Sequence, residues 1–72
     1  MNDSEPDELE AAGRARLKLA LQDHSDLDAA VQALSAAPVP DMMVIGRLKR
    51  KKLLLKDEIA WLESRLIPDS IA

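Results

Sequence analysis

The chain has 72 residues, no cysteine and a formal net charge of -3, so it forms at most one small domain and has neither a disulfide framework nor a thiolate metal site. Trp61 is its single aromatic residue, and aliphatic and charged residues dominate, which is typical of helices that pack through aliphatic seams. A helical core of this size needs an additional source of stability. Because disulfides and thiolate metal sites are excluded, the remaining source is association with another chain.

The first predicted helix spans about residues 5–36. Ser4 is a suitable N-cap, Pro6 is tolerated in the first turn, and acidic residues follow near the positive end of the helix dipole. Apolar residues then recur at alternating spacings of three and four, with one histidine in the same register, which predicts a heptad seam. The seam positions are Leu17, Ala20, His24, Leu27, Val31 and Leu34.

Two prolines interrupt the helical pattern. Pro38 and Pro40 disfavour helical geometry in the residues before them, so residues 37–40 are predicted to form a turn and Asp41 to cap the next helix. That helix is predicted over about residues 41–67, because Pro68 stops it, and residues 68–72 form a short tail. Its seam positions are Ile45, Leu48, Lys52, Leu55, Ile59, Leu62 and Leu66.

A turn this short between two long helices is typical of an antiparallel connection. The sequence therefore predicts an all-α fold: residues 1–72 form one antiparallel two-helix hairpin, similar to a coiled coil, that self-associates into a helical bundle. Residues 1–40 contain eight acidic and three basic residues, whereas residues 41–72 contain five acidic and seven basic residues. Folding back brings these oppositely biased halves together, with Asp23, Asp26 and Asp28 near Lys51, Lys52 and Lys56.

Several short motifs occur together in the two predicted helices. They are His24-x-x-Leu27-Asp28 in the first, and Leu48-Lys49, Lys52-Leu53 and Leu55-Lys56-Asp57-Glu58-Ile59 in the second. Over about residues 17–62 this pattern resembles the YdcH-like family of small bacterial proteins, a domain family of unknown function. Longer members tend to carry aromatic residues in the first helix, where this chain has none. The resemblance implies a two-helix hairpin in the bacterial cytosol, and it implies no activity and no catalytic residues.

Apolar residues of the second helix that lie away from the seam form the first candidate site. Leu53, Leu54, Ala60 and Trp61 occupy b and c positions of the heptad, where a lone hairpin would leave them exposed. Contiguous exposed apolar residues usually mark an interface. We therefore expect Leu53, Leu54 and Trp61 to bind either a second copy of the chain or a partner protein, with Trp61 as the anchor. Self-association ranks first because the hairpin core is small.

The basic stretch between Arg47 and Lys56 is the alternative site, with six of the ten Lys and Arg residues. Phosphate contacts there would give binding of RNA or DNA that is sensitive to salt and independent of sequence. The residues that could face one phosphate backbone are Arg47, Lys49, Arg50 and Lys56. A run of charge is a weak motif, so nucleic acid ranks below a solvated helix face that balances the acidic first helix.

A membrane surface ranks third among the partners, since acidic residues follow the basic stretch directly and the main apolar seam already faces the first helix. His24 has no second His or Cys to form a metal site with, and we expect Asp28, one turn along, to satisfy it. Asp57 and Glu58 diverge on the helix, and a hairpin offers no enclosed pocket. We therefore expect no catalysis, no cofactor and no small-molecule substrate.

The acidic start of the chain has no apolar core behind basic residues, so it does not match a targeting signal. Apolar runs also stay well short of the roughly 18–20 residues that a membrane-spanning helix needs. The expected location is the cytoplasm.

Overall fold

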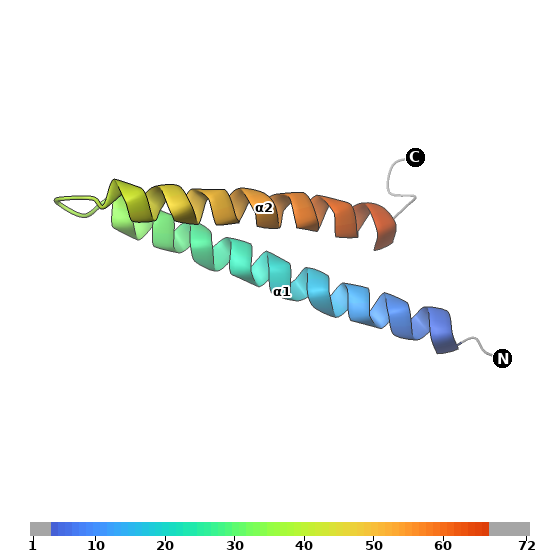
Figure 1. Ribbon diagram of the computed structural model, residues 1–72. Coiled ribbons are helices and arrows are strands. Elements are labelled where there is room, and N and C mark those ends of the chain that lie inside the picture. Colours follow the sequence, from blue (N-terminus) through green and yellow to red (C-terminus); the bar gives the residue numbers. More distant parts are fainter. Residues whose placement is uncertain (1–3, 67–72) are drawn as a thin grey trace.

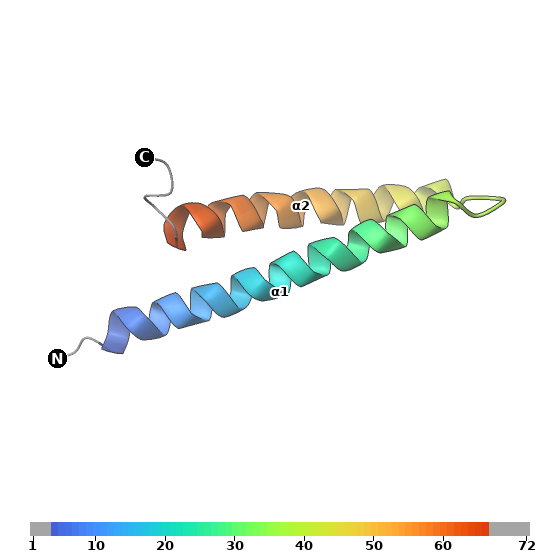
Figure 2. The ribbon, with the colours of Figure 1, turned by 180° about the vertical axis from the view of Figure 1, so that it is seen from behind.

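A computed structural model of the chain describes residues 4–66, with side chains described from residue 8 onward. Within these residues it contains two helices, α1 (Ser4–Ser35) and α2 (Met42–Leu66), and no strand. The helices run side by side in opposite directions and are joined by a short connection (Figure 1). The helix axes are closest near that connection and diverge toward their other ends (Figures 1 and 2). The predicted antiparallel hairpin is confirmed.

The helix bounds agree closely with those predicted from the sequence. α1 begins at Ser4 and ends at Ser35, and α2 begins at Met42, so each of these bounds differs from its prediction by one residue. The predicted role of Ser4 as a cap concerns a side chain outside the described part, and Ile67 and the tail of residues 68–72 lie outside the described residues.

Asp41 caps α2 as predicted. Its Oδ1 accepts hydrogen bonds from the backbone N–H groups of Met43 and Val44, both at 3.1 Å. Its carbonyl oxygen accepts the backbone N–H of Ile45 at 3.0 Å, which is the first hydrogen bond of the α2 ladder. The cap satisfies two backbone donors that have no partner within the helix.

All predicted seam positions are buried or half-buried, so the heptad prediction is confirmed. The buried side chains among the described residues are Ala20, Val31, Ile45 and Leu62. The half-buried ones are Leu17, His24, Leu27, Leu34, Leu48, Lys52, Leu55, Ile59 and Leu66. No large side chain of the described part is completely buried, so the hairpin alone has a thin core.

Gly13 lies opposite Leu66 at the open end of the hairpin. A Cβ atom built on Gly13 would lie 3.2 Å from Cδ2 of Leu66, which is closer than an ordinary van der Waals contact. The missing side chain therefore lets Leu66 pack directly on the backbone of α1, where the two helices are beginning to separate.

Candidate protein-interaction surface

The three apolar residues predicted to form an interface are exposed on α2. Leu53, Leu54 and Trp61 have relative exposures of 57%, 65% and 57%. Leu54 and Trp61 are seven residues apart and so share one flank of the helix, whereas Leu53 lies about 100° around from Leu54. The guanidinium of Arg65 stacks over the Trp61 ring, with Cζ 5.0 Å from the ring centroid. This cation–π contact favours one orientation of the exposed indole.

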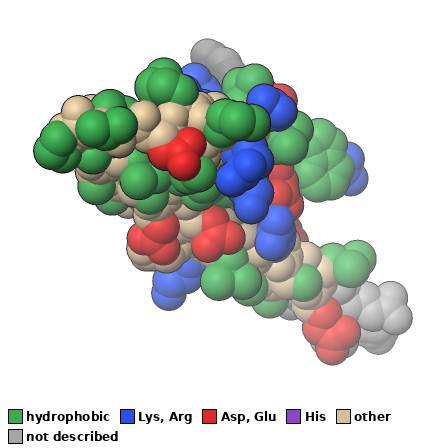
Figure 3. Space-filling model, turned by 60° about the vertical axis from the view of Figure 1, so that its left-hand side comes forward, with side chains coloured by type: hydrophobic (Ala, Val, Ile, Leu, Met, Phe, Trp, Pro, Cys, Tyr) green, Lys and Arg blue, Asp and Glu red, His purple; other side chains and the backbone are tan. Residues whose placement is uncertain are grey.

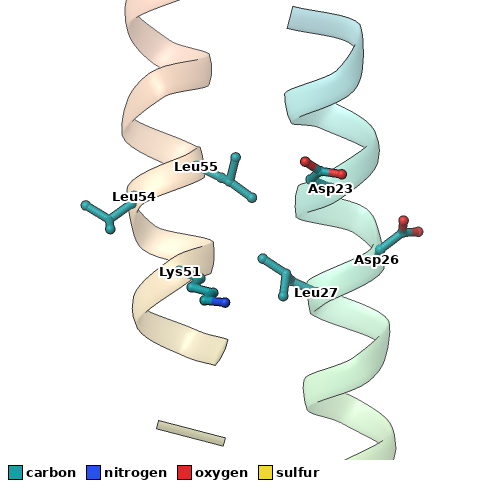
Figure 4. Close-up of a pocket in the computed structure, with 6 residues that line it drawn as sticks. All are labelled: Asp23, Asp26, Leu27, Lys51, Leu54 and Leu55. Atoms are coloured by element: carbon teal, nitrogen blue, oxygen red, sulfur yellow. The ribbon is translucent and has the colours of Figure 1, made fainter. Parts of the chain in front are cut away.

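A groove lies between the helices, beside Leu54. It has a volume of about 460 Å³ and is lined by Asp23, Asp26, Leu27, Lys51, Leu54 and Leu55. Leu27 and Leu55 point toward one another between the helices and form its apolar floor (Figure 4). The α1 side carries two carboxylates and the α2 side carries an ammonium group. The two walls of the groove therefore have opposite charge.

Asp28 and Lys52 join the helices in the half of the hairpin nearer the connection, as predicted. The Lys52 ammonium donates to Oδ1 of Asp28 at 2.7 Å, and Gln32 Nε2 donates to the other carboxylate oxygen at 3.2 Å. The hydrogen bond from Lys52 is the main reason that the pKa of Asp28 is lowered. The hydrogen bonds that the described residues make to the Asp28 carboxylate come from Lys52 and Gln32 and not from His24, so the expected pairing of His24 with Asp28 stays a prediction.

Arg16 and Glu58 form a second ion pair between the helices, which the sequence analysis missed. Nε of Arg16 donates to Oε2 of Glu58 at 2.5 Å and Nη2 donates to Oε1 at 2.7 Å. These hydrogen bonds lower the pKa of the Glu58 carboxyl. The sequence positions of the two residues could have indicated this pair. Arg16 directly precedes the seam residue Leu17 and Glu58 directly precedes the seam residue Ile59, so both lie on the flank that faces the groove.

The basic residues proposed to contact phosphate are exposed, and they spread over the outer surface of α2. They are Arg47, Lys49, Arg50 and Lys56. None of the ion pairs found within residues 4–66 includes any of the four, whereas Lys52 of the same stretch pairs with Asp28. Among the described residues of the basic stretch, Lys52 is therefore the one whose charge is balanced by a direct ion pair with α1.

The family model for a protein of unknown function, DUF465, matches residues 18–63, which is more than half of the chain. The chain belongs to the DUF465 family. YdcH-like proteins are members of it, so the resemblance seen in the sequence motifs is confirmed. No curated protein and no solved structure matches the chain. The part matched by DUF465 contains the whole groove lining and the exposed pair Leu54 and Trp61.

Further apolar side chains of this DUF465 chain are exposed outside the predicted interface on α2. Leu9, Leu19 and Leu21 are exposed on α1, and Val39, Met42 and Met43 are exposed around the connection. Figure 3 shows apolar side chains gathered at the loop end, with acidic and basic side chains next to one another behind them. The signal for Leu19 was available, since it lies off the seam in the same way as Leu54.

No group of three or more His, Asp or Glu side chains in the described part of the chain could hold a metal ion. Neither α1 nor α2, over the residues described, is long and apolar enough to cross a membrane.

Proposed function

We propose that this chain is a cytoplasmic, non-catalytic protein-interaction module that binds a further protein chain, its own or a partner's, through Leu53, Leu54 and Trp61. The observation that carries the proposal is that each of these three side chains of α2 is more than half exposed. Full burial of such a side chain is worth about 1.5–3 kcal/mol, so covering all three would add substantially to the stability of a thin hairpin.

Trp61 is the anchor of this surface. Tryptophan and arginine are the residues most enriched among those that dominate binding energy, and here Arg65 stacks on the Trp61 ring. An indole already held in one orientation loses less side-chain entropy when a partner covers it.

The test is the substitution Trp61→Glu, because a carboxylate there cannot be buried without a partner for its charge. We expect the molar mass from light scattering to fall, or binding of a partner protein to be lost, while the helical circular dichroism signal stays mostly intact. Ala29→Glu adds the same charge at an exposed position on the outer side of α1 and serves as the matched control. Unchanged mass and unchanged partner binding in Trp61→Glu would contradict the proposal.

A second candidate function is binding to RNA or DNA through Arg47, Lys49, Arg50 and Lys56. It is favoured by the absence of these four exposed cations from the ion pairs of the described residues. Such free cations can release counterions from a phosphate backbone. If these residues contact phosphates, the logarithm of the association constant should fall linearly with the logarithm of the salt concentration between about 50 and 200 mM.

Arg50→Gln tests this second function, since losing one phosphate contact reduces the salt slope by about one. Lys18→Gln, an exposed cation on α1, is the control and leaves the slope unchanged. Binding that does not depend on salt, or no binding at low salt, eliminates the nucleic-acid function.

A further inference from the structure

The groove side of the hairpin carries an exposed apolar residue on each helix. Leu54 lines the groove on α2, and Trp61 follows it by seven residues on the same flank. Asp26 lines the groove on α1, and Leu19 precedes it by seven residues, with a relative exposure of 58%. Leu19 and Trp61 therefore lie on the same side of the molecule, one heptad beyond the groove.

The register of the hairpin sets Leu19 at the level of Trp61. Gly13 lies opposite Leu66, and Asp28 pairs with Lys52 two heptads further along the seam. Between these two contacts, the antiparallel register sets Leu19 beside Trp61 and Asp26 beside Leu54. The exposed apolar residues Leu19 and Trp61 thus lie at the same height on the two helices, and so do the groove residues Asp26 and Leu54.

The charged residues of the groove are left without an ionic partner inside the hairpin. Among the ion pairs of residues 4–66, none includes Asp23, Asp26 or Lys51. The acidic residues belong to α1 and the basic residue to α2. A surface that satisfies this groove must therefore present a positive charge over α1 and a negative charge over α2.

A second copy of the same chain meets that requirement in one arrangement. A twofold axis parallel to the helices places α1 of each copy over α2 of the other, at unchanged height. The acidic wall of one groove then faces Lys51 of the other copy, and Leu19 faces Trp61. A twofold axis across the helices would instead set α1 against α1, so that acidic walls would face each other.

We propose that the groove face binds a second copy of this chain across a twofold axis parallel to the helices, with Leu19 of each copy packed on Trp61 of the other. The result is a four-helix bundle in which neighbouring helices are antiparallel. This inference rests on the proposed function, which it deepens by naming the partner and by adding Leu19 to the surface. It also gives the thin hairpin the burial that it lacks.

Molar mass as a function of chain concentration provides the first test. We expect a dimer, and we expect Leu19→Glu and Trp61→Glu each to raise its dissociation constant by more than about tenfold. Leu21→Glu is the matched control: it is the same change on the same helix, at an exposed side chain about 200° around from Leu19, and it leaves the dimer intact. A monomer at every concentration, or equal effects of Leu19→Glu and Leu21→Glu, overturns the inference.

Cross-linking provides the second test and leaves the apolar residues unchanged. The chain has no cysteine, so Ala33→Cys and Arg47→Cys each introduce a single thiol on the groove side, at matching heights. Mixing the two single variants under oxidising conditions is expected to give mainly the mixed 33–47 disulfide. Mainly 33–33 or 47–47 disulfides, or no cross-link, overturn the arrangement.

The two proposals can fail separately. If Trp61→Glu dissociates the protein from its partner while Leu19→Glu and the cross-links show no effect, the second-copy arrangement is wrong and the interaction function stands. If Trp61→Glu changes neither mass nor binding, both fail together.

Discussion

Arg16 and Glu58 stand 42 residues apart in the sequence and are joined by two parallel hydrogen bonds across the hairpin. This two-point geometry between a guanidinium and a carboxylate is directional as well as charged, so it favours one alignment of the two helices. Both side chains remain partly exposed, at 49% and 33%. We therefore expect the pair to act on the register of α1 against α2 more than on overall stability.

Exchanging the charges of this pair tests whether Arg16 and Glu58 act together. Arg16→Glu or Glu58→Arg alone puts like charges together and should lower the melting temperature, whereas the double exchange should recover most of the loss. Thermal unfolding followed by circular dichroism measures this, at equal chain concentration because association raises apparent stability. A double exchange as unstable as the sum of the single changes would show that the two residues do not act together.

Acid should weaken the hairpin through Asp28 and Glu58. Hydrogen bonds from Lys52 and Arg16 lower the pKa of these carboxyls in the folded state. Their contribution to stability is therefore fully present above the unfolded values, which lie near 4, and is lost as the pH falls through the lowered folded values. We expect the free energy of unfolding to be constant from pH 7 to about 5 and to decline below that.

Urea unfolding between neutral and acidic pH measures this decline. The double variant Asp28→Asn with Glu58→Gln retains the size of both side chains and removes their titration, so its decline below about pH 5 should be shallower. If the free energy of unfolding of the double variant falls equally steeply, the sensitivity to acid comes from other carboxyl groups.

The sequence predicted those parts of the fold that depend on local chemistry and on periodicity. Pro38 and Pro40 located the turn, Asp41 identified the start of α2, and heptad spacing located the seam. The groove and the Arg16–Glu58 pair were missed for a different reason. They depend on which off-seam side chains reach across from one helix to the other in the folded hairpin, and heptad spacing does not give those contacts.

The candidate interface was predictable in part. Leu53, Leu54 and Trp61 followed from off-seam positions on one helix. Leu19 lies off the seam in the same way, so its exposure was equally predictable. Its place at the height of Trp61 is a property of the folded hairpin and not of α1 alone.

Asp41 should be a measurable contributor to the stability of α2. Asp41→Ala removes the acceptor of the N–H groups of Met43 and Val44, and a lost cap of this kind costs about 1 kcal/mol, within a range of about 0.5–2. For a domain of this size, that corresponds to a fall in melting temperature of roughly 4–8 °C. Asp41→Asn keeps an acceptor at the same place and should retain most of the stability. Equal melting temperatures for the Ala and Asn variants would contradict the capping role.

The two glycines should respond differently to alanine. Each lies inside a helix, where replacing glycine by alanine stabilises by about 0.5–1 kcal/mol. A Cβ on Gly46 meets nothing within 4 Å, so Gly46→Ala should show the full gain in the free energy of unfolding. A Cβ on Gly13 would require the half-buried Leu66 side chain to shift by a few tenths of an ångström, so Gly13→Ala should gain less.

Chemical denaturation of four variants separates helix propensity from this contact. Leu66→Ala removes the crowding atoms, so Gly13→Ala should show a larger gain in the Leu66→Ala background than in the natural sequence, with a coupling energy of about 0.5 kcal/mol or more. Gly46→Ala should show the same gain in both backgrounds, because its Cβ has no neighbour to relieve. Equal gains for Gly13→Ala in the two backgrounds would mean that Leu66 does not pack on Gly13 in solution and that the open end of the hairpin is wider than described.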